Sequence, residues 1–292
     1  MYELIPVTEK VLYFDTPTKV GILRLNETDV VSVDAGSDKD AGKKLLRALD
    51  ANGWTLRAVY CTHSHADHTG AAHHLQEKTG CAVYAADTEA CIARNPILEP
   101  AYVYGADPLP ELRGKFLTAQ PSRAELLTED RLPAGVRMFS LPGHCAQMLG
   151  FRTEEDVVFL ADSICSEQTL QKYALTFLTD VGAYLQTLEQ VKTMQARCFI
   201  PAHAPVLSDI APLAQKNIDV ILANAERIAS LCTEPVIFEE LLSRLFRSYA
   251  IPMNLTQYTL IGSTLRTYLT WLCAQNRVRF FFENERMLWE RV

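Results

Sequence analysis

The stretch His63-Ser64-His65-Ala66-Asp67-His68 places four potential metal ligands within six residues. Imidazole and carboxylate groups are the ligands that zinc, iron and manganese take from proteins. An apolar core cannot hold such a stretch, because neutral imidazoles need polar partners and an unpaired carboxylate is costly to bury. An amphipathic helix is excluded as well, since the polar residues cover every face. The stretch therefore favours a metal-binding loop over a polar surface loop.

Other candidate ligands are far apart in the sequence, and each follows a segment with strand composition. They are Asp34 at the end of 29–34, His144 after 136–141, Asp162 after 157–161 and His203 after 198–200. The histidine stretch itself follows a predicted strand over 57–61. Loops at strand ends are where a sheet scaffold presents its functional side chains. We therefore expect these separate loops to converge on one site.

In content and in order, these segments resemble the motifs of the metallo-beta-lactamase superfamily. The stretch HSHADH is similar to the HxHxDH motif, and LPGHC, FLADS and PAHAP follow it in the superfamily's order. The resemblance covers roughly residues 8–208. It implies an α/β fold of the αββα sandwich type, with two mixed sheets face to face and helices outside. The predicted strands and helices also favour two sheets, because several strands are consecutive.

The resemblance also implies two metal sites with three protein ligands each and one shared ligand. The residues in these places are His63, His65 and His144 for the first ion, Asp67, His68 and His203 for the second, and Asp162 between them. Asp34 would orient the histidine loop without binding metal. The expected cofactors are two divalent ions, with Zn²⁺ favoured and iron or manganese as alternatives.

Such a site is expected to catalyse hydrolysis. Water bound to a metal loses its proton near neutral pH, so a hydroxide that bridges the two ions would attack the substrate. Asp67 would accept a hydrogen bond from this hydroxide and transfer a proton, which makes it the predicted catalytic residue. The complete ligand set fits glyoxalase II-like thioesterases and lactonases. We therefore predict a hydrolase of a small ester, thioester or lactone.

Three alternatives remain open at this point. One is a metal-dependent phosphodiesterase or nuclease, since ribonuclease Z-like enzymes share the ligand pattern. Another is an iron-dependent oxidoreductase of the persulfide type, which would use one iron instead of two metals. The third is an interaction protein with a vestigial site, although no ligand is missing from the sequence.

The composition limits the partners and the compartment. Hydrophobic residues make up 48% and charged residues 22% of the 292 residues, as is typical of soluble globular proteins. The net charge of −7 gives no electrostatic reason to expect binding to nucleic acid. No apolar run is long enough to span a membrane, and the start MYELIPVTEKVLYFD carries no signal-peptide pattern. Together with eight cysteines that form no CxxC motif, this predicts a cytoplasmic protein with a small-molecule substrate and no membrane partner.

Residues 95–122 interrupt the pattern of strands and helices. The segment contains five prolines and no clear period, so we expect it to lack regular structure. A segment of this kind is either functional, as a lid or a pocket wall, or a plain surface insertion.

The end of the chain predicts a second, smaller unit. Helices over 238–249 and 255–274 and a hairpin of strands 277–282 and 286–291 follow the order of a winged-helix domain. We therefore predict a metallo-beta-lactamase-like domain over 1–208 and a helical, winged-helix-like domain over 209–292. Similar tails occur in superfamily members of the lactamase-like-2 group. Residues 206–292 carry nine basic and nine acidic residues, so we expect the tail to pack over the site or to join a homodimer, not to bind nucleic acid.

Overall fold

A seven-stranded sheet forms the first layer of the protein, and its strands lie in the order of the chain. The computed structural model describes residues 3–173 and 175–292. The strands are β1 (Glu3–Pro6), β2 (Val11–Asp15), β3 (Val20–Arg24), β4 (Asp29–Val33), β5 (Thr55–Tyr60), β6 (Ala82–Ala85) and β7 (Ala124–Leu126). Strands β1 to β4 pair antiparallel and β4 to β7 pair parallel. The carboxyl ends of β4, β5 and β6 therefore meet at one edge.

Three helices cover the outer face of this sheet. They are α1 (Lys39–Ala51), α3 (Ala72–Thr79) and α4 (Asp87–Arg94). Leu45 and Leu49 of α1 and Leu75 of α3 join Ile22 and Val59 of the sheet in one buried apolar cluster. Burial of apolar side chains at helical spacing thus holds this layer together.

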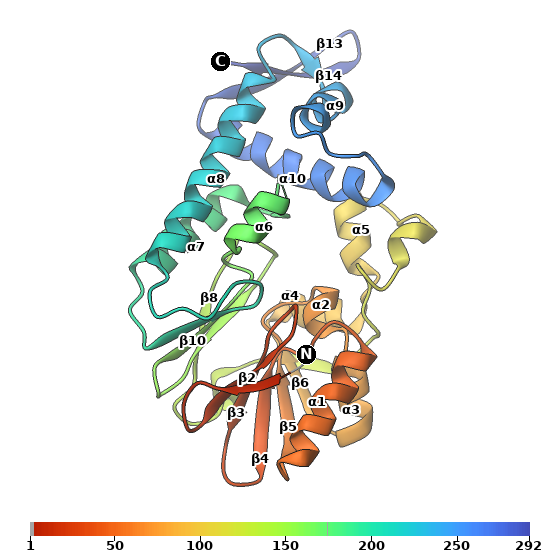
Figure 1. Cartoon of the computed structure of the whole chain (residues 1–292). Coiled ribbons are helices and arrows are strands. Elements are labelled where there is room, and N and C mark those ends of the chain that lie inside the picture. Colours follow the sequence, from red (N-terminus) through yellow and green to blue (C-terminus); the bar gives the residue numbers. More distant parts are fainter. Residues whose placement is uncertain (1–2, 174) are drawn as a thin grey trace.

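A four-stranded sheet with the order β11-β10-β9-β8 packs against the inner face of the first sheet. Its strands are β8 (Arg137–Ser140), β9 (Leu149–Arg152), β10 (Val157–Ala161) and β11 (Cys198–Pro201). Helices α7 (Val181–Thr193) and α8 (Ala211–Ser230) cover its outer face (Figure 1). The predicted αββα sandwich is confirmed.

Apolar residues of both sheets meet between the layers. Val31 and Tyr60 of the first sheet share a buried cluster with Phe151 and Phe159 of the second sheet. Gly21 in β3 makes room for one of these rings, because a Cβ there would lie 2.3 Å from a ring carbon of Phe159. The close packing of the two sheets fixes the loops at their edges.

The segment 95–122 contains regular structure, so the prediction that it has none is wrong. Helix α5 (Leu98–Tyr104) and the 3₁₀ helix η1 (Pro110–Arg113) lie within it, with Val103 and Leu112 buried. Helices this short show too little of the helical period to be found from sequence. Helix α2 (Ala66–Thr69) begins inside the histidine stretch and is separate from α3. Helix α6 (Glu167–Lys172) and strands β1 and β7 were not predicted.

The C-terminal region contains the predicted helices and hairpin and one further strand. Its elements are β12 (Val236–Ile237), α9 (Phe238–Ser248), α10 (Leu255–Ala274), β13 (Val278–Glu283) and β14 (Arg286–Arg291), with the sheet order β12-β14-β13. Its apolar residues belong to the same buried cluster as Tyr184 of α7 and Ile218 of α8. The winged-helix class and the boundary at residue 208 stay predictions.

Helix α10 reaches across the molecule and lies against α5 (Figure 1). The segment 95–122 and the C-terminal region are therefore in contact over the edge where the strand-end loops meet.

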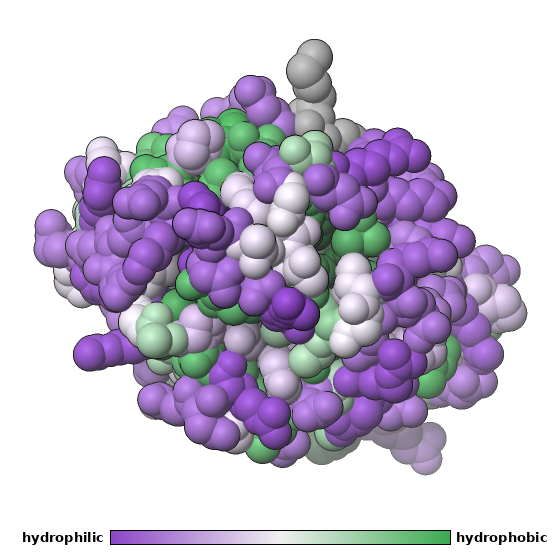
Figure 2. All heavy atoms as spheres, turned by 90° about the horizontal axis from the view of Figure 1, so that it is seen from below, coloured by the Kyte–Doolittle hydropathy of each residue, from purple (hydrophilic) through white to green (hydrophobic). Residues whose placement is uncertain are grey.

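Within the described ranges, no helix is both long and apolar enough to cross a membrane. Hydrophilic residues cover most of the end of the molecule seen from below, and apolar residues form only small groups there (Figure 2). All eight cysteines are free.

Candidate metal centre

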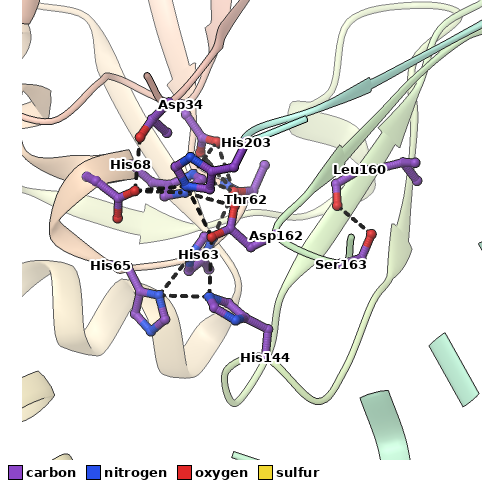
Figure 3. Close-up of polar contacts among 12 residues, drawn as sticks. Asp34, Thr62, His63, His65, His68, His144, Leu160, Asp162, Ser163 and His203 are labelled. Carbon is purple, nitrogen blue, oxygen red and sulfur yellow. Dashed lines mark hydrogen bonds and ion pairs between the residues drawn. The ribbon is translucent and has the colours of Figure 1, made fainter. Parts of the chain in front are cut away.

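Five loops at the carboxyl ends of strands bring the predicted site residues together (Figure 3). The loop after β5 supplies four of them, and the loops after β4, β8, β10 and β11 supply one each. The residues are Asp34, His63, His65, Asp67, His68, His144, Asp162 and His203. The expected convergence of these loops is present in the fold.

Three imidazoles form a first group. Nδ1 of His65 lies 3.0 Å from Nε2 of His63 and 3.0 Å from Nε2 of His144. One nitrogen from each ring thus faces the same point, and the three atoms lie within 4.8 Å of one another. This group could hold a metal ion.

A second group lies beside the first and contains carboxylates. Nε2 of His203 lies 3.1 Å from Oδ2 of Asp67, and Nε2 of His68 lies 3.6 Å from the same oxygen. Asp162 reaches both groups, because its Oδ2 is 3.3 Å from Nε2 of His203 and 3.5 Å from Nε2 of His144. A carboxylate in this place is close enough to be shared by two cations.

Two buried atoms test whether the cluster fits a cation. Nε2 of His68 and Oδ1 of Asp162 have no hydrogen-bond partner among the residues that the structure describes. They lie 3.1 Å apart, yet without the geometry of a hydrogen bond. Buried polar atoms without partners are rare and costly. Both atoms carry lone pairs that a divalent ion accepts, so the donor set fits such ions.

The far ring nitrogen of each histidine in the cluster meets an oxygen acceptor. These acceptors are Oγ1 of Thr62 for His63, Oε1 of Glu99 for His65, Oδ2 of Asp34 for His68, and the carbonyl oxygens of Phe177 for His144 and of Pro17 for His203. A hydrogen bond at the far nitrogen fixes the orientation of the ring and leaves the near nitrogen able to bind a cation once it has lost its proton. All five rings are therefore oriented as metal ligands are.

Asp34 has the supporting position that the sequence suggested. Its Oδ2 accepts a hydrogen bond of 2.8 Å from Nδ1 of His68, and its Oδ1 accepts one of 2.7 Å from the backbone N–H of Thr62. The Thr62 hydroxyl contacts both Asp34 oxygens and Nδ1 of His63. Asp34 thereby ties the histidine loop to the end of β4.

Two buried carboxylates at the site were missed in the sequence. Oε1 of Glu99, on α5, lies 3.2 Å from Nε2 of His65. Glu89, on α4, accepts hydrogen bonds from the Ser64 backbone and hydroxyl and from the Gln147 backbone. It therefore joins the loop of His63 and His65 to the loop of His144. A signal for Glu89 existed in the sequence, since at helical spacing this acidic residue falls on the same face as Ala90 and Ala93.

The charges of the cluster shift its pKa values in opposite directions. Burial and the nearby His65 lower the pKa of His144 to about 4. Burial also acts to lower the pKa of His65, but Glu99 outweighs it and raises that pKa to about 9. At His203, Asp162 likewise outweighs burial and raises the pKa to about 10. Without metal, His65 and His203 are therefore protonated near neutral pH, and these protons must leave before cations bind.

The geometry agrees with comparisons to known proteins. A sequence model of the Metallo-beta-lactamase superfamily matches residues 14–203. An atrochrysone carboxyl ACP thioesterase from Aspergillus fumigatus is 25% identical over 193 residues, which are 64% of this chain and 51% of that protein. A hydroxyacylglutathione hydrolase from Methylococcus capsulatus is 31% identical over 132 residues, which are 44% of this chain and 42% of that protein. The chain thus spans about half or less of the length of these two relatives.

Two solved structures resemble nearly the whole chain. A beta-lactamase domain protein from Burkholderia ambifaria has a TM-score of 0.72 at 17% identity, covering 99% of this chain and 94% of that one. A metallo-beta-lactamase family protein from Thermus thermophilus has a TM-score of 0.71 at 16% identity, covering 100% of this chain and 98% of that one. Both likenesses concern the fold alone. The family model matches more than half of the chain, so the chain belongs to the metallo-beta-lactamase superfamily.

Proposed function

We propose that this chain is a hydrolase that holds two divalent metal ions and acts on a small ester, thioester or lactone. The observation that carries the proposal is the set of acceptors behind all five histidines, since it leaves five imidazole nitrogens facing one cluster. The superfamily implies divalent ions, and the names of the relatives support a thioester.

The spacing of the first group supports a zinc ion in this place. Ligand nitrogens about 2.0–2.1 Å from a tetrahedral ion lie about 3.3 Å from one another. The two nitrogen pairs of His63, His65 and His144 at 3.0 Å are close to this spacing. Asp67, His68 and His203 would hold the second ion, and Asp162 would lie between the ions. Three imidazoles in the first group favour zinc over iron or manganese.

Once bound, two such ions would polarise a carbonyl oxygen and lower the pKa of water to near neutrality. The chain's own residues hold the site in shape and manage protons. Asp67 accepts a hydrogen bond of 2.9 Å from the Thr18 hydroxyl through Oδ2, and nearby histidines outweigh burial and lower its pKa. An ionised carboxylate at this position is suited to accept a hydrogen bond from a nucleophile.

Metal analysis combined with one substitution tests the proposal. We expect the purified protein to bind two zinc ions and to hydrolyse a thioester or lactone in a metal-dependent manner. His65→Ala should lower the metal content and reduce kcat/KM by about 100-fold or more, because it removes a ligand of the first group. His73→Ala is the matched control, since His73 bonds the Pro121 carbonyl outside the cluster. Full metal content and activity in His65→Ala would contradict the assignment.

A further inference from the structure

A cavity of about 260 Å³ opens directly beside the metal cluster. His144, Asp162 and His203 form its wall on the cluster side. Leu260 and Ile261 of α10 also line it. A group bound at the cluster can therefore extend straight into this cavity, and the C-terminal region shapes it.

The lining of the cavity is poor in charge. Apart from the cluster residues themselves, no lysine, arginine or carboxylate lines it among the described residues. Ile164, Leu175 and Phe177 contribute apolar surface. An uncharged, largely apolar lining favours an apolar ligand group and disfavours an anionic one, which would be buried without a partner.

A neighbouring cavity differs in containing two cationic side chains. It has a volume of about 660 Å³. Lys172 and Arg227 line it, and no residue of the metal cluster does. The two cavities share Tyr173 and Gln257 among their lining residues. Cations are thus available a short distance away but are kept out of the cavity at the cluster.

We propose that the cavity beside the cluster binds the acyl group of the substrate, and that this group is an uncharged aliphatic chain of about six to eight carbons. The inference rests on the proposed hydrolase function. The cavity volume of about 260 Å³ leaves room for an aliphatic chain of this length. A carrier thiol with phosphate or carboxylate groups does not fit this uncharged lining, so the acyl side of the scissile bond enters the cavity.

A series of thioesters with one leaving group tests the assignment. We expect kcat/KM for N-acetylcysteamine thioesters to rise about fourfold per methylene from acetyl to about hexanoyl, and to level off or fall beyond octanoyl. A glutaryl thioester, which ends in a carboxylate, should react at least about 100-fold more slowly than hexanoyl. A second measurement needs no turnover. Straight-chain carboxylates from acetate to decanoate should bind the zinc-loaded protein with affinities that follow the same order.

A charge placed in the cavity should change the preference. Leu260→Lys should lower kcat/KM for the hexanoyl thioester at least about tenfold and raise it for the glutaryl thioester. Leu260→Met should keep the original order. Leu222→Lys is the matched control, since Leu222 lies on the exposed side of α8.

The outcomes separate this inference from the proposed function. Metal-dependent hydrolysis that is insensitive to chain length and to Leu260→Lys would overturn the acyl assignment and leave the hydrolase standing. If no thioester is hydrolysed, the proposed function fails, and the carboxylate affinities alone decide whether the cavity selects apolar chains.

Discussion

Nε2 of His65 lies 3.2 Å from Oε1 of Glu99, and the two side chains are only 15% and 10% exposed. Nδ1 of the same ring faces His63 and His144. Glu99 thus fixes the orientation of a ring whose other nitrogen belongs to the first group of candidate ligands. Because Glu99 is on α5 and α5 lies against α10, this contact also connects the C-terminal region to the metal cluster.

Removing the charge of Glu99 should weaken metal binding without removing a ligand. We expect Glu99→Gln to lower the zinc affinity of the first group about 10–100-fold, because the amide polarises His65 less than a carboxylate does. Competition with a chelator of known affinity measures the change. Glu111→Gln, an exposed change in the same segment, serves as the control. An unchanged zinc affinity in Glu99→Gln would show that the contact does not support the ligand.

Replacing Asp34 by asparagine should switch the tautomer of His68. An asparagine would keep its carbonyl oxygen on the Thr62 N–H and turn its amide N–H toward Nδ1 of His68. The proton of His68 would then move to Nε2, the atom that faces the cluster, and metal affinity at the second group should fall at least about 10–100-fold. Zinc stoichiometry and chelator competition measure this loss.

A change in backbone strain cannot account for the expected loss of zinc affinity in Asp34→Asn. Asp34 has φ 66°, a conformation that asparagine adopts as readily as aspartate. Asp156→Asn is the matched control, because Asp156 has φ 62° in a turn away from the cluster. Equal zinc binding by Asp34→Asn and Asp156→Asn would refute the tautomer argument.

The convergence of the candidate ligands could be predicted from sequence, but most of the residues that contact them from behind could not. His144, Asp162 and His203 each stand in a short motif directly after a strand, so local patterns were enough to find them. Glu99 stands in a seven-residue helix that was predicted to be irregular. Its role depends on where α10 holds that helix, and a contact between distant segments leaves no local pattern.

Glu89 shows the opposite case. It lies on α4 and is buried on the same face as Ala90 and Ala93. A carboxylate on an apolar helix face needs buried donors, which the Ser64 and Gln147 backbones provide. The sequence therefore contained evidence for a buried contact at Glu89, but not for the identity of its partners.

Metal binding should release protons from the cluster. In the metal-free protein Asp162 outweighs burial and raises the pKa of His203 to about 10, and the pKa of His68 is raised as well. The His203 ring is therefore protonated at about pH 7.5, and an ion can bind its Nε2 only after that atom loses its proton. Because of this proton, zinc affinity at the second group should fall about tenfold for each pH unit below about 10. Calorimetry of zinc binding in buffers of different ionisation enthalpy measures the number of released protons. A binding enthalpy that does not depend on the buffer would contradict the expectation.

Gly143 should be indispensable for the loop that carries His144. Its φ is +115°, and a Cβ there would lie 2.3 Å from the backbone nitrogen of Tyr184 in α7. The Gly143 carbonyl also accepts hydrogen bonds from the backbone N–H groups of Thr179 and Asp180 just before that helix. An alanine must therefore move either the helix or the loop, so we expect Gly143→Ala to cost about 3 kcal/mol or more in the free energy of unfolding. For a chain of this size the melting temperature should fall by about 6–12 °C, with reduced zinc content.

Gly114→Ala is the control, because a Cβ at Gly114 would point into open space. The melting temperature of this variant should lie within about 1 °C of that of the parent protein. A Gly143→Ala variant as stable as Gly114→Ala, with full zinc content, would mean that the loop does not need this close approach.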